Sequence, residues 1–122
     1  MFHVADSSGQ GVIQASDESG IYALGAVQDQ NHLAPGTVLS SFVLDVDKAY
    51  DSVVKMVMNG NFTGNIFRPG VELQRGSDGQ GIVYLAPFHG LESRVPESVQ
   101  ERLTKLTNEI LQEKIGVPER LS

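Results

Sequence analysis

A short run of polar residues near the amino terminus has the composition of a ligand-binding loop. The apolar stretch of residues 2–5 is followed at once by Asp6, Ser7, Ser8 and Gly9, which places these four at the carboxyl end of a predicted strand. Small ligands bind at that edge of open α/β sheets, and the Asp6 carboxylate can accept hydrogen bonds from ligand hydroxyls. The simpler alternative is a turn that opens a helix, in which Ser8 caps the free amides of the first turn.

The other candidate binding residues carry weaker patterns. His3, His32 and His89 lack the paired spacing of a metal site on one helix or turn. Each is therefore interpreted as a surface or strand-end histidine, and no metal or cofactor is expected. Residues 9–11 match half of a dinucleotide fingerprint, but Gln14 occupies the third glycine position.

An enzyme is not expected. A hydrolase of the small α/β type would use Ser7 or Ser8 as its nucleophile, with Asp6 and a histidine as partners. The chain has no Gly-x-Ser-x-Gly elbow, and no motif places a general base beside either serine.

Composition limits the class of protein. The chain has 122 residues, a formal net charge of −6, 40% hydrophobic residues and no Cys, which suits a single globular domain or part of one. The acidic balance, without a Lys/Arg cluster, argues against nucleic-acid binding, and the lack of Cys excludes disulfides and thiolate zinc sites. No apolar run is long enough to span a bilayer. Because natural domains seldom begin inside a core strand, we expect the chain to be part of a longer protein.

Hydrophobic spacing predicts a strand, helix, strand unit at the start, which extends with a third strand over residues 1–45. The helix is predicted to run from Ser8 to a C-cap at Gly20, and the nearly continuous apolar run 21–27 indicates a buried strand. A polar loop follows at residues 29–35. The β-branched and apolar residues of 37–44 predict a further strand.

Residues 46–122 are predicted to hold a crossover helix, hairpin strands and a last helix. The crossover helix begins at Asp45 or Asp47 and ends at the Asn59-Gly60 pair. Its predicted buried face consists of Val46, Ala49, Tyr50, Val53, Val54 and Val57. Strand-like runs at 66–73 and 81–86 flank a hairpin-type loop at 74–80. The last helix follows Pro96, stops at Gly116 and Pro118, and is predicted to bury Val99, Leu103, Leu106 and Ile110.

Four segments in this order resemble a known family. They are FHVADSSGQGV, GIYALGAVQDQ, APGTVLSSFVLDVDKAYDSV and GIVYLAPFHGLESRVPESVQERL, and together they are similar to the carboxyl-terminal part of the basic membrane protein family, the PnrA-like substrate-binding lipoproteins of ABC transporters. The resemblance implies an α/β fold with a mainly parallel sheet flanked by helices, as part of a two-lobe type I periplasmic-binding-protein fold. It also implies a nucleoside-like ligand, an ABC permease as partner, an amino-terminal lobe outside this chain, and an extracytoplasmic lipid anchor in the full-length form.

The loop after the first strand matches the family only in part. The family usually has Gly-Gly-Thr-Gly there, so Gly9 is a match, Ser8 replaces the Thr, and Asp6 and Ser7 replace two glycines. The resemblance places all four among the ligand-binding residues, although the bulkier side chains would narrow the approach to the backbone.

The ends of the next two strands depart further from the family. The second strand commonly ends in Gly-Val-Asp-Ser-Asp-Gln, and here Asp29 and Gln30 match while Val27 stands where the family's Asp binds sugar hydroxyls. Leu44 similarly replaces a Lys that faces the ligand. Phe42, near the end of its strand, is a candidate to stack on a base. Asp29 and Gln30 are interpreted as groups that stabilise the loop.

Two functions follow from these observations. The first is a non-catalytic solute receptor that captures its ligand between two lobes and presents it to a permease. The second is a regulatory or sensor protein that reuses the receptor fold, because apolar Val27 and Leu44 at polar family positions are typical of an altered pocket.

Overall fold

The computed structural model describes residues 1–64, 81–112 and 114–115. The predicted strand at 66–73 and the loop at 74–80 lie outside these ranges. Gly116 and Pro118, the predicted stop of the last helix, also lie outside them, but that helix ends earlier, at Leu111.

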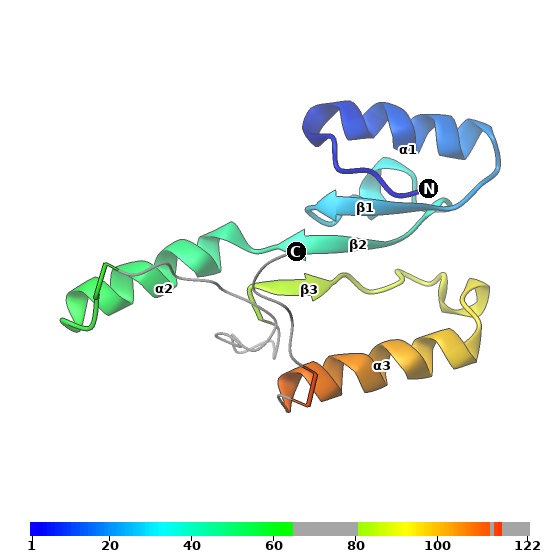
Figure 1. The fold of residues 1–122 in the computed structure, drawn as a ribbon. Helices are drawn as coiled ribbons and strands as arrows, with labels where there is room; N and C mark the ends of the chain where they lie inside the picture. The colour runs from blue at the N-terminus through cyan, green and yellow to red at the C-terminus, as the bar shows by residue number, and fades with distance from the viewer. Residues whose placement is uncertain (65–80, 113, 116–122) are drawn as a thin grey trace, which may run out of the picture.

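The described residues form a three-stranded sheet with helices on either side of it (Figure 1). Strands β1 (Ala23–Val27), β2 (Val38–Leu44) and β3 (Val83–Leu85) lie in the order β1-β2-β3. β1 and β2 are parallel, so the chain must cross over between them, and β3 runs antiparallel to β2. The mixed α/β fold with parallel strands at its amino-terminal end confirms the predicted fold class.

The first predicted strand, residues 2–5, is reduced to one parallel bridge between Phe2 and Leu24. The backbone amide of Leu24 donates to the carbonyl of Met1 at 2.7 Å. Beyond Phe2 the backbone diverges toward a one-turn 3-10 helix, Asp6–Ser8. The segment therefore occupies the predicted place beside β1 with a shorter ladder than its apolar pattern indicated.

Helix α1 (Gly9–Glu18) begins and ends near the predicted residues. At its end, Gly20 adopts φ +65° while the amides of Gly20 and Ile21 donate to the carbonyls of Asp17 and Ser16. This is a Schellman motif, which confirms the predicted glycine stop. The predicted Ser8 cap is wrong: Ser8 has helical backbone angles and its side chain makes no capping hydrogen bond, whereas a capping residue needs an extended backbone.

A small core joins α1 to the sheet. Its buried residues are Ile13 from α1, Ala23 from β1, Ala34 from the β1–β2 connection and Val38 from β2. Ile13 and Val38 are almost completely buried, at 1% and 0% exposure. This packing fixes α1 against the parallel strands, and it thereby fixes the loop that enters α1.

Helix α2 (Val46–Met58) begins as predicted but does not bury its predicted face. The Asp45 carboxylate accepts from the amide of Lys48 at 3.0 Å, which confirms the cap. Figure 1 shows α2 leaving the end of β2 and pointing away from the sheet. Four of the predicted buried residues are exposed, namely Val46, Tyr50, Val54 and Val57. The periodicity of the sequence identifies an apolar stripe on this helix, but it does not predict which other elements cover that stripe.

Helix α3 (Glu97–Leu111) follows Pro96 and lies on the β3 side of the sheet (Figure 1). Of the face that was predicted to be buried, Leu103 and Ile110 are half-buried, while Val99 and Leu106 are 44% and 38% exposed. None of the helices in the described part has the length and apolar character needed to cross a membrane.

Candidate functional site

A hollow lies where the amino-terminal segment and β1 both reach their carboxyl ends. It has a volume of about 520 Å³, within the range of roughly 300–1,000 Å³ typical of small-molecule sites. One wall comes from the segment that enters α1, and the other comes from the end of β1 and the residues after it. The lining residues are His3, Val4, Ala5, Asp6, Ser7, Gln10, Ala26, Val27, Gln28 and Gln30. The structure thus brings Asp6, Ser7 and Val27, from the predicted set, to one place.

Each wall contains a residue in a left-handed backbone conformation. Asp6 has φ +43° and Val27 has φ +70°. This region is unusual for any residue with a Cβ and most unusual for a β-branched one such as Val. The two conformations turn the chain away from its strand direction at the hollow, and strained residues of this kind gather at ligand sites.

A buried side-chain brace connects the two walls. His3 is 7% exposed, and its Nε2 lies 3.0 Å from Oε1 of Gln30. The same Oε1 accepts from the amide of Ala26 at 2.9 Å. Because a carbonyl oxygen cannot donate, His3 Nε2 must carry the proton. His3 Nδ1 is buried and has no hydrogen-bond partner among the described residues.

The brace continues to β2 and depends on two glycines. The backbone amide of Gln30 donates to Ser41 Oγ at 3.0 Å. A Cβ at Gly9 would lie 2.0 Å from His3 Cε1, and a Cβ at Gly25 would lie 2.3 Å from Ser41 Oγ. Both positions therefore have room for the brace only because they lack a side chain.

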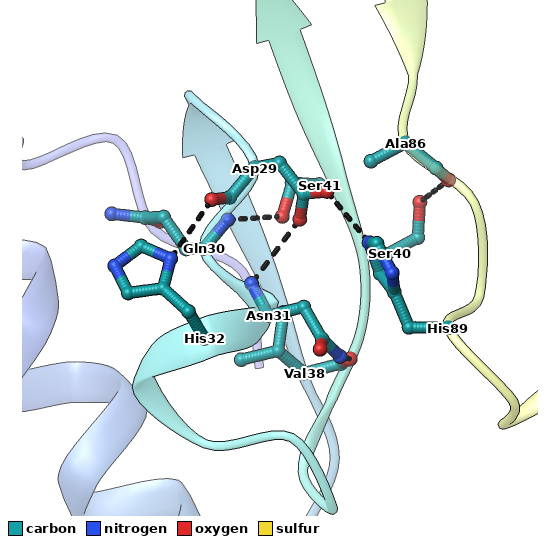
Figure 2. Close-up of polar contacts among 9 residues, drawn as sticks. All are labelled: Asp29, Gln30, Asn31, His32, Val38, Ser40, Ser41, Ala86 and His89. Atoms are coloured by element: carbon teal, nitrogen blue, oxygen red, sulfur yellow. Dashed lines mark hydrogen bonds and ion pairs between the residues drawn. The ribbon is translucent and has the colours of Figure 1, made fainter.

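A second polar cluster fixes the loop that follows β1 (Figure 2). Asp29 Oδ1 accepts from the amide of Asn31 at 3.2 Å, and Asp29 Oδ2 lies 2.6 Å from Nε2 of His89, in the segment between β3 and α3. Asn31 Nδ2 in turn donates to the carbonyl of Val38 at 3.0 Å. The prediction that Asp29 and Gln30 stabilise the loop is confirmed. His89, predicted only as a surface or strand-end residue, links this loop to the segment that follows β3, the strand at the opposite edge of the sheet from β1.

The other predicted site residues lie outside the lining of the hollow. Ser8 is the exposed residue before α1, and Gly9 begins α1 against the His3 ring. Phe42 pairs with Ala26 and Leu85 within the sheet, and Leu44 ends β2 opposite Val83. A ligand role for these four stays a prediction.

Sequence reasoning underestimated His3. It was interpreted as a surface or strand-end histidine, yet it is buried between the walls. Two features of the sequence could have predicted this burial. Strand alternation places His3 on the face opposite to Phe2, and a glycine, Gly9, stands at the start of the following helix. Among the described residues, no group of three or more His, Cys, Asp or Glu is arranged to hold a metal ion.

Comparison with known proteins gives related sequences of two kinds. The chain is 34% identical over 95 residues to the transcriptional activator protein med of Bacillus subtilis, covering 78% of this chain and 27% of that protein. It is 29% identical over 121 residues to basic membrane protein C of Borreliella burgdorferi, covering 98% of this chain and 32% of that protein. The chain therefore spans about a third of the length of the curated relatives that it matches.

A solved structure has the same fold. The crystal structure of a transcriptional activator of the comK gene from Bacillus halodurans superimposes with a TM-score of 0.69 at 24% identity, over 93% of this chain and 37% of that one. The family described as ABC transporter substrate-binding protein PnrA-like matches residues 1–120. This match extends over nearly the whole chain, and the chain belongs to the PnrA-like family of ABC transporter substrate-binding proteins.

Proposed function

We propose that this chain forms one side of the solute-binding site of a receptor that serves an ABC importer. The observation that carries the proposal is the hollow between residues 3–7 and the end of β1, because it is of ligand size and lies at the carboxyl ends of parallel strands. The family match supports the same function. The site has no assembled nucleophile and base among the residues that line it, so binding without catalysis is the simplest use of this geometry.

The finer features of the proposal come from the resemblance to the family. The ligand is a nucleoside or a related small polar metabolite, and the second wall of the cleft comes from the remainder of a longer protein. The receptor works outside the cytoplasm on a lipid anchor and delivers its ligand to permease subunits. One side of a cleft buries too little of a ligand for tight binding, so the 122-residue chain alone should bind weakly.

A thermal-shift screen of the complete protein against nucleosides, sugars and other small metabolites tests the proposal. A ligand that binds the folded state raises the melting temperature by mass action, and a concentration of 100 times Kd adds about 2.7 kcal/mol. Ser7→Trp places a large side chain at the wall and should abolish the shift. Ser93→Trp provides the matched control, because Ser93 is exposed and does not line the hollow.

The second candidate is a regulatory protein that keeps the receptor fold. It is favoured by the similarity to the activator from Bacillus subtilis and by the apolar Val27 in the wall of the hollow. If no compound in the screen raises the melting temperature, the receptor proposal fails and the regulatory function is favoured.

A further inference from the structure

The hollow has an unequal distribution of charge. Asp6 supplies its single carboxylate, and none of the described residues that line it is Lys or Arg. The other polar side chains of the lining are the amides of Gln10, Gln28 and Gln30, the hydroxyl of Ser7 and the imidazole of His3, which is bonded to Gln30. An anionic ligand in this hollow would therefore meet a like charge with no compensating Lys or Arg from these walls.

The Asp6 carboxylate is available for a ligand. It is exposed, and no hydrogen bond or ion pair within the described ranges involves its side chain. By contrast, Asp17, Asp29 and Asp45 each bond to a neighbouring group. Asp6 is thus a carboxylate at the hollow whose lone pairs are not already used by the fold.

The two walls offer different surfaces. Asp6 lies in the wall that leads into α1, and Val27 lies in the wall formed by the end of β1. The Val27 side chain is apolar and 38% exposed. Both residues have positive φ angles, so each is held in place by the surrounding structure. A ligand that satisfies both walls needs donors on one side and an apolar face on the other.

We infer that Asp6 determines the charge class of the ligand. The hollow takes a neutral or cationic solute whose hydroxyl or amino groups donate to the Asp6 carboxylate and whose apolar face lies against Val27. Solutes that carry a phosphate or carboxylate at that position are excluded. This inference rests on the proposed function, since it specifies the ligand of the same hollow.

A matched series of probes tests the charge class on the complete protein. Adenosine, 5′-amino-5′-deoxyadenosine and adenosine 5′-monophosphate share one scaffold and differ in charge, and glucose, glucosamine and glucose 6-phosphate form a second series. On the scaffold that binds, calorimetry should give the neutral and cationic members at least about tenfold tighter binding than the anionic member.

Two variants then separate the carboxylate from the backbone. Asp6→Asn keeps the shape and removes the charge, and Asp6→Gly also removes the left-handed strain. Both variants should reduce the ratio of the affinity for the neutral or cationic ligand to that for the anionic ligand by about tenfold, because a ligand donor loses its charged acceptor. Glu101→Gln, an exposed residue of α3 that does not line the hollow, changes the net charge equally and should leave the preference intact.

The outcomes distinguish this inference from the proposed function. If a probe binds but the anionic member binds as tightly as the others, or if Asp6→Asn leaves the preference unchanged, the inference about Asp6 is wrong while solute binding stands. If no member of either series binds, the inference fails. A hit elsewhere in the wider screen would then keep the receptor function.

Discussion

Replacing Gly9 by Ala tests the brace that holds the two walls of the hollow together. The new Cβ would lie 2.0 Å from His3 Cε1 and 2.1 Å from His3 Nδ1, far closer than atoms can approach, so the ring must move. His3 is buried, and moving it breaks its 3.0 Å contact with Gln30. The backbone of Gly9 is already helical, with φ −61°, so the substitution causes no backbone strain of its own.

The size of the effect can be read from a control in the same helix. Gly11→Ala meets no atom within 4 Å, so it should stabilise the protein by about 0.5–1 kcal/mol. Gly9→Ala gains a similar amount from the backbone but pushes against the His3 ring, and overpacking costs roughly 1–3 kcal/mol. The backbone gain is common to both variants. The difference in their free energies of unfolding should therefore be about 1–3 kcal/mol.

Urea denaturation followed by far-ultraviolet circular dichroism gives these free energies, since the chain has no Trp for fluorescence. The same pair of substitutions in a His3→Ala background completes a double-mutant cycle. With the ring removed, Gly9→Ala should behave like Gly11→Ala. Equal stabilities of the two variants in the natural background, or no coupling between positions 3 and 9, would refute the brace.

Two further predictions concern the cap of helix α2 and a close contact between β1 and β2. Asp45→Ala removes the acceptor for the backbone amide of Lys48 and should lower the free energy of unfolding by about 1 kcal/mol. Asp45→Asn keeps an acceptor oxygen and should retain most of the stability. Equal losses for the two variants in urea denaturation would contradict the cap. Gly25→Ala places a Cβ 2.3 Å from Ser41 Oγ and should lower stability by roughly 1–3 kcal/mol. In the control Gly36→Ala, the new Cβ meets nothing within 4 Å, so the free energy of unfolding should change by less than about 0.5 kcal/mol. Similar melting temperatures for these two glycine variants would show that Gly25 is not tightly packed.

Local signals in the sequence predicted where elements begin and end. Asp45 caps α2 and Gly20 ends α1 because each acts through hydrogen bonds within a few residues of itself. The strands β1 and β2 were found because apolar and β-branched runs describe buried strands in any context. Ser8 failed as a cap because a preceding 3-10 turn left it helical, and that turn depends on how the first segment joins the sheet.

Burial was harder to predict, because it depends on partners that are distant in sequence. The stripe on α2, which includes Tyr50 and Val54, has the spacing of a buried face and is exposed in the described structure. His3 shows the reverse, since a polar residue is buried by a glycine in α1 and a glutamine after β1. Neither fact can be obtained from periodicity, which describes one element at a time.

The sequence placed Asp6, Ser7 and Val27 at strand ends, and the structure brings these three together at the hollow, while their ligand role stays a prediction. The brace formed by His3, Gln30 and Ser41 links the two walls of the hollow and connects them to β2. Asp6 and Val27 project from the walls that the brace supports. Residues at the ends of strands can change without disturbing the packed sheet beneath them. Under the proposed function, the receptor fold can therefore stay unchanged while side chains such as Asp6 and Val27 alter which ligand the hollow accepts.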